Sequence, residues 1–232
     1  MQTTSAASLG PVVSSSLSQR LFNLFACPGD VFDEVAWSPG NAANWRVPTL
    51  LTCLSGIILT LRSPAMDQMT AALKQLAQSG AVSTAQAEFL AGAWPLVSCL
   101  GVCLAVVAGS IWSAIVFWGI GRFFLKTSFS FLKALEVVGL SGMILVLGSL
   151  VTGLLISATG DPHARPSLWL LAGKLHGNAL RQVLNLFDLF HLWSMATMTI
   201  GLSRLTGVSF KEAGFWIFGY WCVARIALIL LA

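Results

Sequence analysis

The chain has 232 residues, of which 56% are hydrophobic and only 9% are charged. An average soluble domain carries about 25% charged residues, and a globular protein of this size must turn much of its surface to water. The 13 basic residues exceed the 9 acidic ones by too little to indicate nucleic-acid binding. The composition therefore predicts an all-α, polytopic integral membrane protein, a helical bundle with about five transmembrane helices.

The amino-terminal region precedes the apolar segments. Residues 1–19 are rich in Ser, Ala and Thr and are expected to form a disordered tail. In residues 20–43, an aromatic and aliphatic cluster is followed by Val31, Phe32 and Val35 at helical spacing. An amphipathic helix on the membrane surface explains this pattern. A helix packed against the bundle explains it equally well.

Five apolar segments divide residues 44–232. A transmembrane helix needs about 20 apolar residues, and the first segment is the shortest of the five. Residues 63–94 lie between the first two and are predicted to form an extramembrane helical hairpin, in which Gly80 ends the first helix. Ser83 and Gln86 have the spacing of a capping box that begins the second. The predicted spans are residues 45–62, 96–120, 134–158, 183–202 and 213–232.

Small residues recur on one face of the second predicted span. Gly101, Ala105, Gly109 and Ser113 fall at every fourth position. Such a face lets another helix approach closely in a membrane. The pattern therefore predicts a helix-packing surface, and it fits a contact within one chain as well as a contact between two.

The basic residues predict the orientation. Two short loops are the richest in Lys and Arg: one holds Arg122, Lys126 and Lys133, and the other holds Arg204 and Lys211. Short basic loops are retained in the cytoplasm. The sequence therefore predicts a plasma (inner) membrane protein with a cytoplasmic amino terminus and an outside carboxyl terminus.

Two other sets of polar residues lie in the predicted spans. Glu136 follows Lys133 by three residues, so the two can pair on one helix face. Cys99 and Cys103 are four residues apart, but no His or Asp accompanies them, and a metal site is not predicted. The chain also lacks the phosphate-loop, serine-elbow and His-Glu metal motifs. We therefore predict no enzyme, no catalytic residues and no cofactor.

The fourth predicted span contains the most informative polar residues. Asn185, Asp188 and His191 recur at every third position and so fall near one face of a helix. Arg225 lies at a similar depth in the fifth span if the two ends share one side. The pattern predicts an ion pair between Asp188 and Arg225, with His191 or Asn185 completing the hydrogen bonds. The same carboxylate and imidazole could instead relay protons or bind a cation, as such groups do in transporters.

Several motifs resemble the Yip-domain family of membrane proteins. In the carboxyl-terminal part these are residues 185–193 (NLFDLFHLW), 200–209 (IGLSRLTGVS) and 211–213 (KEA). A weaker match in the amino-terminal part covers residues 27–34 (CPGDVFDE) and 44–48 (NWRVP).

The resemblance implies a five-span fold and a non-enzymatic role. The family is named for eukaryotic proteins that interact with Rab GTPases, but the Asp-Leu-Tyr-Gly-Pro signature of those members is missing here and the single tyrosine is Tyr220. Rab-type GTPase binding is therefore not carried over, and the chain is more similar to bacterial members. The expected function is a scaffold or membrane-organising component, in contact with the lipid bilayer and with copies of itself or other membrane proteins. The alternative is a small transporter or channel subunit that uses the polar face around Asp188.

Overall fold

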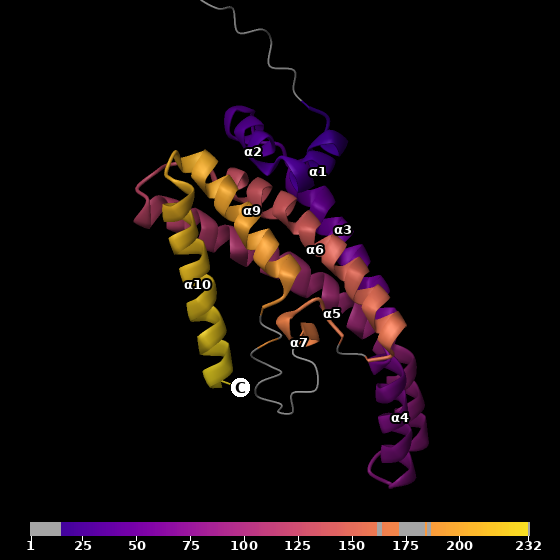
Figure 1. Ribbon diagram of the computed structural model, residues 1–232. Coiled ribbons are helices and arrows are strands. Elements are labelled where there is room, and N and C mark those ends of the chain that lie inside the picture. The colour runs from indigo at the N-terminus through magenta and orange to yellow at the C-terminus, as the bar shows by residue number, and fades with distance from the viewer. Residues whose placement is uncertain (1–14, 162–163, 172–183, 185–186, 232) are drawn as a thin grey trace, which may run out of the picture.

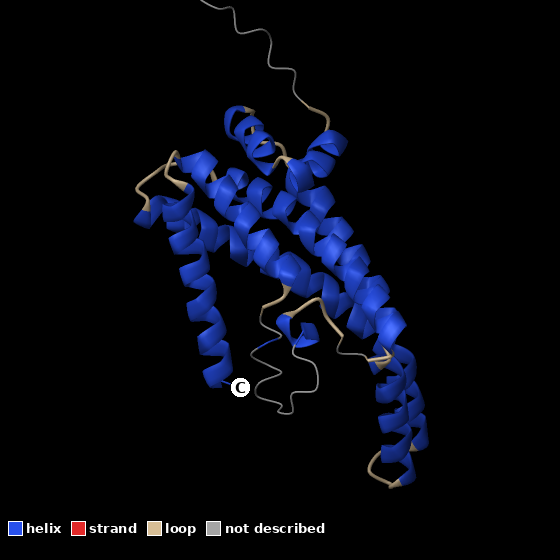
Figure 2. Cartoon of the chain, in the orientation of Figure 1, coloured by secondary structure: helices blue, strands red, loops and turns tan. Residues whose placement is uncertain are grey.

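The computed structural model describes residues 15–161, 164–171, 184 and 187–231, and every regular element in these ranges is a helix (Figures 1 and 2). This confirms the all-α prediction. The single turn η1 is π-helical and ends the longest helix. The elements are α1 (Leu17–Ala26), α2 (Pro28–Trp37), α3 (Ala43–Leu61), α4 (Ala65–Gln78), α5 (Thr84–Gly119), η1 (Ile120–Phe124), α6 (Phe131–Thr159), α7 (Leu168–Leu171), α9 (Leu189–Thr206) and α10 (Phe210–Leu231).

The central helices pack side by side, and the two ends of this bundle carry different elements. Helix α6 packs between α3 and α9, and α5 packs on both α3 and α6. Figure 1 shows α1 and α2 at one end, and α4 with the start of α5 projecting from the other. Helix α10 packs on α9 and then diverges from it.

The described helices fit a membrane bundle. Residues Thr84–Phe124 and Phe131–Thr159 are long and apolar enough to cross a membrane, and the pair α3 and α4, bent by 50°, would add a third span. Helices α3, α5, α6, α9 and α10 overlap the five predicted spans. The crossing of the membrane by α9 and α10 remains a prediction.

Reporter fusions test the five-span topology. Fusions after Lys126 and after Thr206 should report the cytoplasm, because the short basic loops are expected there. Fusions after Gly80 and after Asp161 should report the outside. If Gly80 and Lys126 report the same side, α5 does not cross the membrane.

The predicted helical hairpin is present. Gly80, with φ +77°, lies between α4 and α5, and Ser83 and Gln86 form the capping box at the start of α5. The second span was predicted to begin at residue 96, whereas α5 begins at Thr84 and continues through Pro95. One continuous helix therefore forms both the second arm of the hairpin and the apolar segment.

The amino-terminal segment differs from the predicted tail. Residues 1–14 lie outside the described residues, but Ser16 caps α1 through a capping box with Gln19, so the helix begins within the predicted tail. Leu24, Phe32 and Val35 are fully buried, and α2 packs on α9. The structure therefore supports the interpretation that this segment packs against the bundle.

A chain of buried polar groups joins α1 and α2 to the bundle. Arg20 donates to Glu34 at 2.8 Å and to the side-chain oxygen of Asn44 at 3.2 Å. Asn44 donates to Glu136 at 2.8 Å, and the backbone N–H of Asn41 donates to the other carboxylate oxygen at 2.8 Å. Glu136 is completely buried. Four separate segments of the sequence are therefore held together by one set of hydrogen bonds.

Lys133 completes this buried network. Its ammonium lies 3.7 Å from the Glu136 carboxylate, which confirms the predicted pair. It also donates to the backbone oxygens of Val35 and, at 2.7 Å, Ser38 at the carboxyl end of α2. A cation there interacts favourably with the helix dipole. Lys133 thus fixes α2 to α6 as well as balancing the charge of Glu136.

Acid should weaken the attachment of α1 to α2. Burial alone would raise the pKa of Glu34, but hydrogen bonds from Arg20 and Ser15 outweigh it and hold this pKa below the ordinary value of 4.5. A carboxylate whose pKa is lowered in the folded state stabilises the protein at pH values above its ordinary pKa. That stability is lost as the pH falls through the folded-state pKa. Thermal unfolding measured from about pH 6 down to pH 3 should show this loss. This acid-induced loss of stability should be smaller in Glu34→Gln than in the parent protein. It should equal that of the parent in Asp30→Asn, the control, because Asp30 is an exposed carboxylate.

The small-residue face of α5 was predicted to pack against a helix of the same chain or of another, and among the described residues it makes no close contact at its glycines. A Cβ atom added at Gly101 or Gly109 would meet nothing within 4 Å. The close approach occurs instead between α3 and α6, where a Cβ at Gly139 would lie 2.5 Å from the Trp45 Cα. At Gly201 of α9 it would collide with the Val137 side chain. The ladder of small residues is therefore open in this structure.

Candidate functional site: a polar cavity beside an apolar groove

Asp188 begins helix α9 rather than lying inside it. Its carboxylate accepts hydrogen bonds from the backbone N–H groups of Phe190 at 2.9 Å and His191 at 3.1 Å. This is the N-cap arrangement, which satisfies donors that have no partner within the helix. Helix α9 thus begins at Leu189, inside the predicted span over residues 183–202, and Asp188 lies at its start instead of within a helix. Asn185 lies outside the described residues.

The predicted ion pair between Asp188 and Arg225 is not formed. The Asp188 carboxylate lies 3.4 Å from Nδ1 of His191, and the Arg225 guanidinium lies over the Trp221 ring at 5.7 Å. The carboxylate is satisfied by the helix start and by this imidazole. The partner of Asp188 among the described residues is therefore His191 and not the predicted Arg225.

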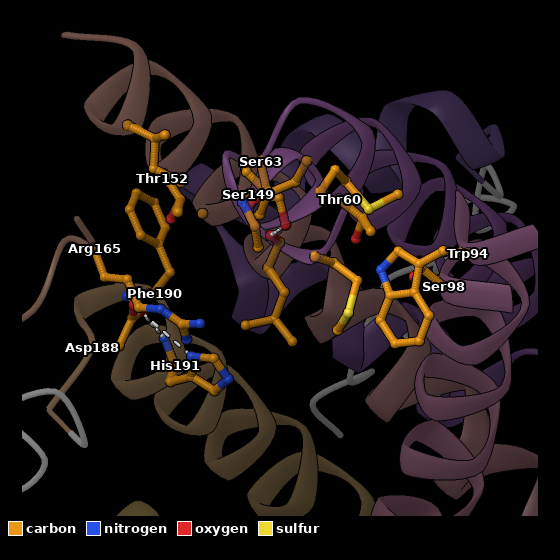
Figure 3. Close-up of a pocket in the computed structure, with 17 residues that line it drawn as sticks. Thr60, Ser63, Trp94, Ser98, Ser149, Thr152, Arg165, Asp188, Phe190 and His191 are labelled. Atoms are coloured by element: carbon orange, nitrogen blue, oxygen red, sulfur yellow. Dashed lines mark hydrogen bonds and ion pairs between the residues drawn. The ribbon is translucent and has the colours of Figure 1, made fainter. Parts of the chain in front are cut away.

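Backbone hydrogen bonds join the loop before α7 to the start of α9. The backbone N–H of Leu189 donates to the oxygen of Pro166 at 2.9 Å, and that of Leu168 donates to Phe187 at 3.3 Å. These bonds bring Arg165 beside Asp188 and His191 (Figure 3). Arg165 was not among the predicted site residues, because only the fold brings this loop to α9.

A polar cavity of about 480 Å³ opens at this end of the bundle, remote from α1 and α2. Figure 3 shows Arg165, Asp188 and His191 on one side of it and Trp94 and Ser98 on the other. Helices α3, α4, α5, α6 and α9 contribute to its wall. Its hydroxyl-bearing residues are Thr60, Ser63, Ser98, Ser149 and Thr152.

An apolar groove of about 350 Å³ adjoins the polar cavity. His191 and Leu145 line both, so the two spaces meet at these side chains. The groove is bounded by α3, α5, α6, α9 and α10, and extends to Ile120 at the end of α5. Three members of the predicted packing face, Ala105, Gly109 and Ser113, line it, whereas Gly101 does not.

Polar groups of α10 also reach the groove. Arg225, Trp221 and Tyr220 line it, and Tyr220 accepts a hydrogen bond of 2.8 Å from the indole of Trp112 on α5. The buried indole nitrogen of Trp221 has no hydrogen-bond partner among the described residues. The groove thus has an apolar body and a polar end near His191.

Comparison with known proteins supports the membrane assignment. The chain is 27% identical over 201 residues to the protein named Membrane protein YknW of Bacillus subtilis (strain 168), a match that covers 85% of this chain and 82% of that protein. No family model matches the chain, and no solved structure matches it. The apolar helices and this relative together show a helical membrane protein.

Proposed function

We propose that the chain is a non-enzymatic, Yip-type scaffold or membrane-organising component of the inner membrane, with α1 and α2 on the cytoplasmic side. The observation that supports this function is the buried network that fixes α1 and α2 to α3 and α6. Its members are Arg20, Glu34, Asn44, Lys133 and Glu136.

The energetics of such a network favour a role in fixing geometry. Removing charges from water is costly, so a buried ion pair is weak evidence for stability, and its best-attested use is to specify one arrangement. Here the arrangement holds Phe22 and Trp37 outward, with 76% and 89% of their surfaces exposed. Exposed aromatic side chains on a rigid support suit the binding of a second protein.

Site-specific photocrosslinking in cells tests this proposal. A photoreactive phenylalanine at position 37 should give discrete adducts with another protein, because Trp37 projects from the rigid end. The matched control is position 89, because Phe89 is also exposed, at 74%, but lies in the hairpin at the opposite end. Equal protein adducts at both positions, or none at position 37, would contradict a scaffold that acts through α1 and α2.

A transporter is the second candidate, and one observation favours it. The polar cavity and the apolar groove meet at His191 and Leu145, so together they extend along much of α5. An ionisable residue beside such a path is a candidate for proton or ion transfer.

Proton flux separates the two candidates. Liposomes containing the purified chain and a pH-sensitive dye should show no flux above protein-free liposomes if the chain is a scaffold. Flux that disappears in Asp188→Asn would instead establish transport, because Asn retains the N-cap hydrogen bonds while removing the charge.

A further inference from the structure

We propose that the apolar groove holds one acyl chain of a glycerophospholipid, whose phosphate lies among Arg165, His191 and Arg225. This site goes beyond the scaffold function, which uses the opposite end of the molecule. The proposal rests on the apolar lining of the groove, its continuity with the polar cavity, and the charges where the two meet.

The groove is long and mainly apolar. It follows α5 from Ala105 to Ile120, which is about 22 Å at 1.5 Å per residue. Among its described lining residues, the basic side chains are His191 and Arg225, and His191 also lines the polar cavity. A single hydrocarbon chain attached to a charged headgroup is the membrane component that matches this length and this separation of apolar and charged surface.

The wall of the groove suits such a chain. Gly109 leaves open space where any side chain would otherwise stand. Val116, Phe117 and Ile217 contribute apolar surface farther along. An acyl chain in this position would cover the apolar wall of the groove. Because the chain carries no polar groups, it would bury none without a hydrogen-bond partner.

The polar end suits a phosphate. Arg165 lines the cavity, Arg225 lines the groove, and His191 lines both. Asp188, the one carboxylate among the described residues that line the cavity and the groove, is already engaged by two backbone N–H groups and the imidazole. Neither arginine has a carboxylate partner within the described residues.

Arg225 is half-buried without a carboxylate partner among the described residues, and a phosphate would offset its charge. Guanidinium groups bind phosphate oxygens through paired, charge-assisted hydrogen bonds. The indole N–H of Trp221, one helical turn from Arg225, is buried and has no hydrogen-bond partner among the described residues. Since the groove continues from this end, one lipid molecule can satisfy both the charges and the apolar space.

The test measures lipid binding to the full chain, purified in detergent and depleted of lipid. Native mass spectrometry and thermal unfolding would be followed with dioleoylphosphatidylglycerol, with dioleoylglycerol and with inorganic phosphate. Dioleoylphosphatidylglycerol should give a one-to-one complex and raise the unfolding temperature. Arg165→Gln and Arg225→Gln should each weaken this binding about tenfold.

Two glycine variants on α5 provide the matched comparison. Gly109→Leu should also weaken binding about tenfold or more, because the new side chain fills the groove. Gly101→Leu should bind like the parent, since Gly101 is equally open but does not line the groove. The unfolding temperature without lipid shows whether each variant remains folded.

Three results would overturn the proposal. Equal stabilisation by inorganic phosphate would show an anion site without a lipid chain. Equal binding of dioleoylglycerol would show that the arginines do not recognise a phosphate. Unchanged binding by a folded Gly109→Leu protein would show that the chain does not occupy the groove.

Discussion

Replacing Glu136 with alanine should destabilise the protein by about 3–5 kcal/mol, the range for removal of one partner from a buried ion pair. The change leaves the Lys133 ammonium without its carboxylate, and the Asn44 amide and Asn41 N–H without their acceptor. Chemical unfolding in detergent, followed by helical circular dichroism, measures the loss. Glu88→Ala provides the control, because Glu88 is an exposed carboxylate in α5.

A double substitution tests the origin of the loss. Lys133→Met combined with Glu136→Leu should recover part of it, since neither charge is then left buried and unmatched. If the separate losses simply add, the two residues act independently. If Glu136→Ala is as stable as the parent, the carboxylate does not hold the four segments together.

Replacing Gly139 with alanine should separate α3 from α6. The added Cβ would lie 2.5 Å from the Trp45 Cα and 3.2 Å from the Asn44 backbone oxygen, so backbone rather than a flexible side chain obstructs it. We expect a loss of about 2–3 kcal/mol, within the usual cost of overpacking. The same unfolding measurement should detect it.

Alanine substitutions at two other glycines provide a comparison for the loss of stability expected at Gly139. Gly201→Ala should cost a comparable amount, because the obstructing atoms belong to the fully buried, β-branched side chain of Val137, which has little freedom to shift. Gly101→Ala should be neutral or slightly stabilising, since nothing lies within 4 Å and alanine favours helices. A Gly101→Ala loss as large as that of Gly139→Ala would contradict the helix arrangement.

Local signals predicted the fold well. The apolar segments located α3, α5, α6 and α10, and the spacing of Ser83 and Gln86 located the start of α5. The pair of Lys133 and Glu136 was also predictable, because the two residues lie on adjacent turns of one helix. Such signals depend on residues close together in the sequence.

The site was less predictable, because it depends on residues brought together by the fold. Asn44 and Glu136 are 92 positions apart, and no periodic pattern joins them. The small residues of α5 predicted a helix-packing surface, and only the placement of α10 shows that three of them border a groove. Asp188 looked like an intramembrane charge because apolar residues precede it as well as follow it, so the predicted span began at residue 183.

The length of the continuous helix also affects how the protein can be imaged. Residues Thr84–Phe124 number 41, or about 60 Å of helix. A bilayer with its headgroups is about 40–45 Å thick, so a helix perpendicular to the membrane should project about 15 Å into water. In a small lipid disc viewed from the side, this projection would mark one membrane face and make the two orientations of the particle distinguishable.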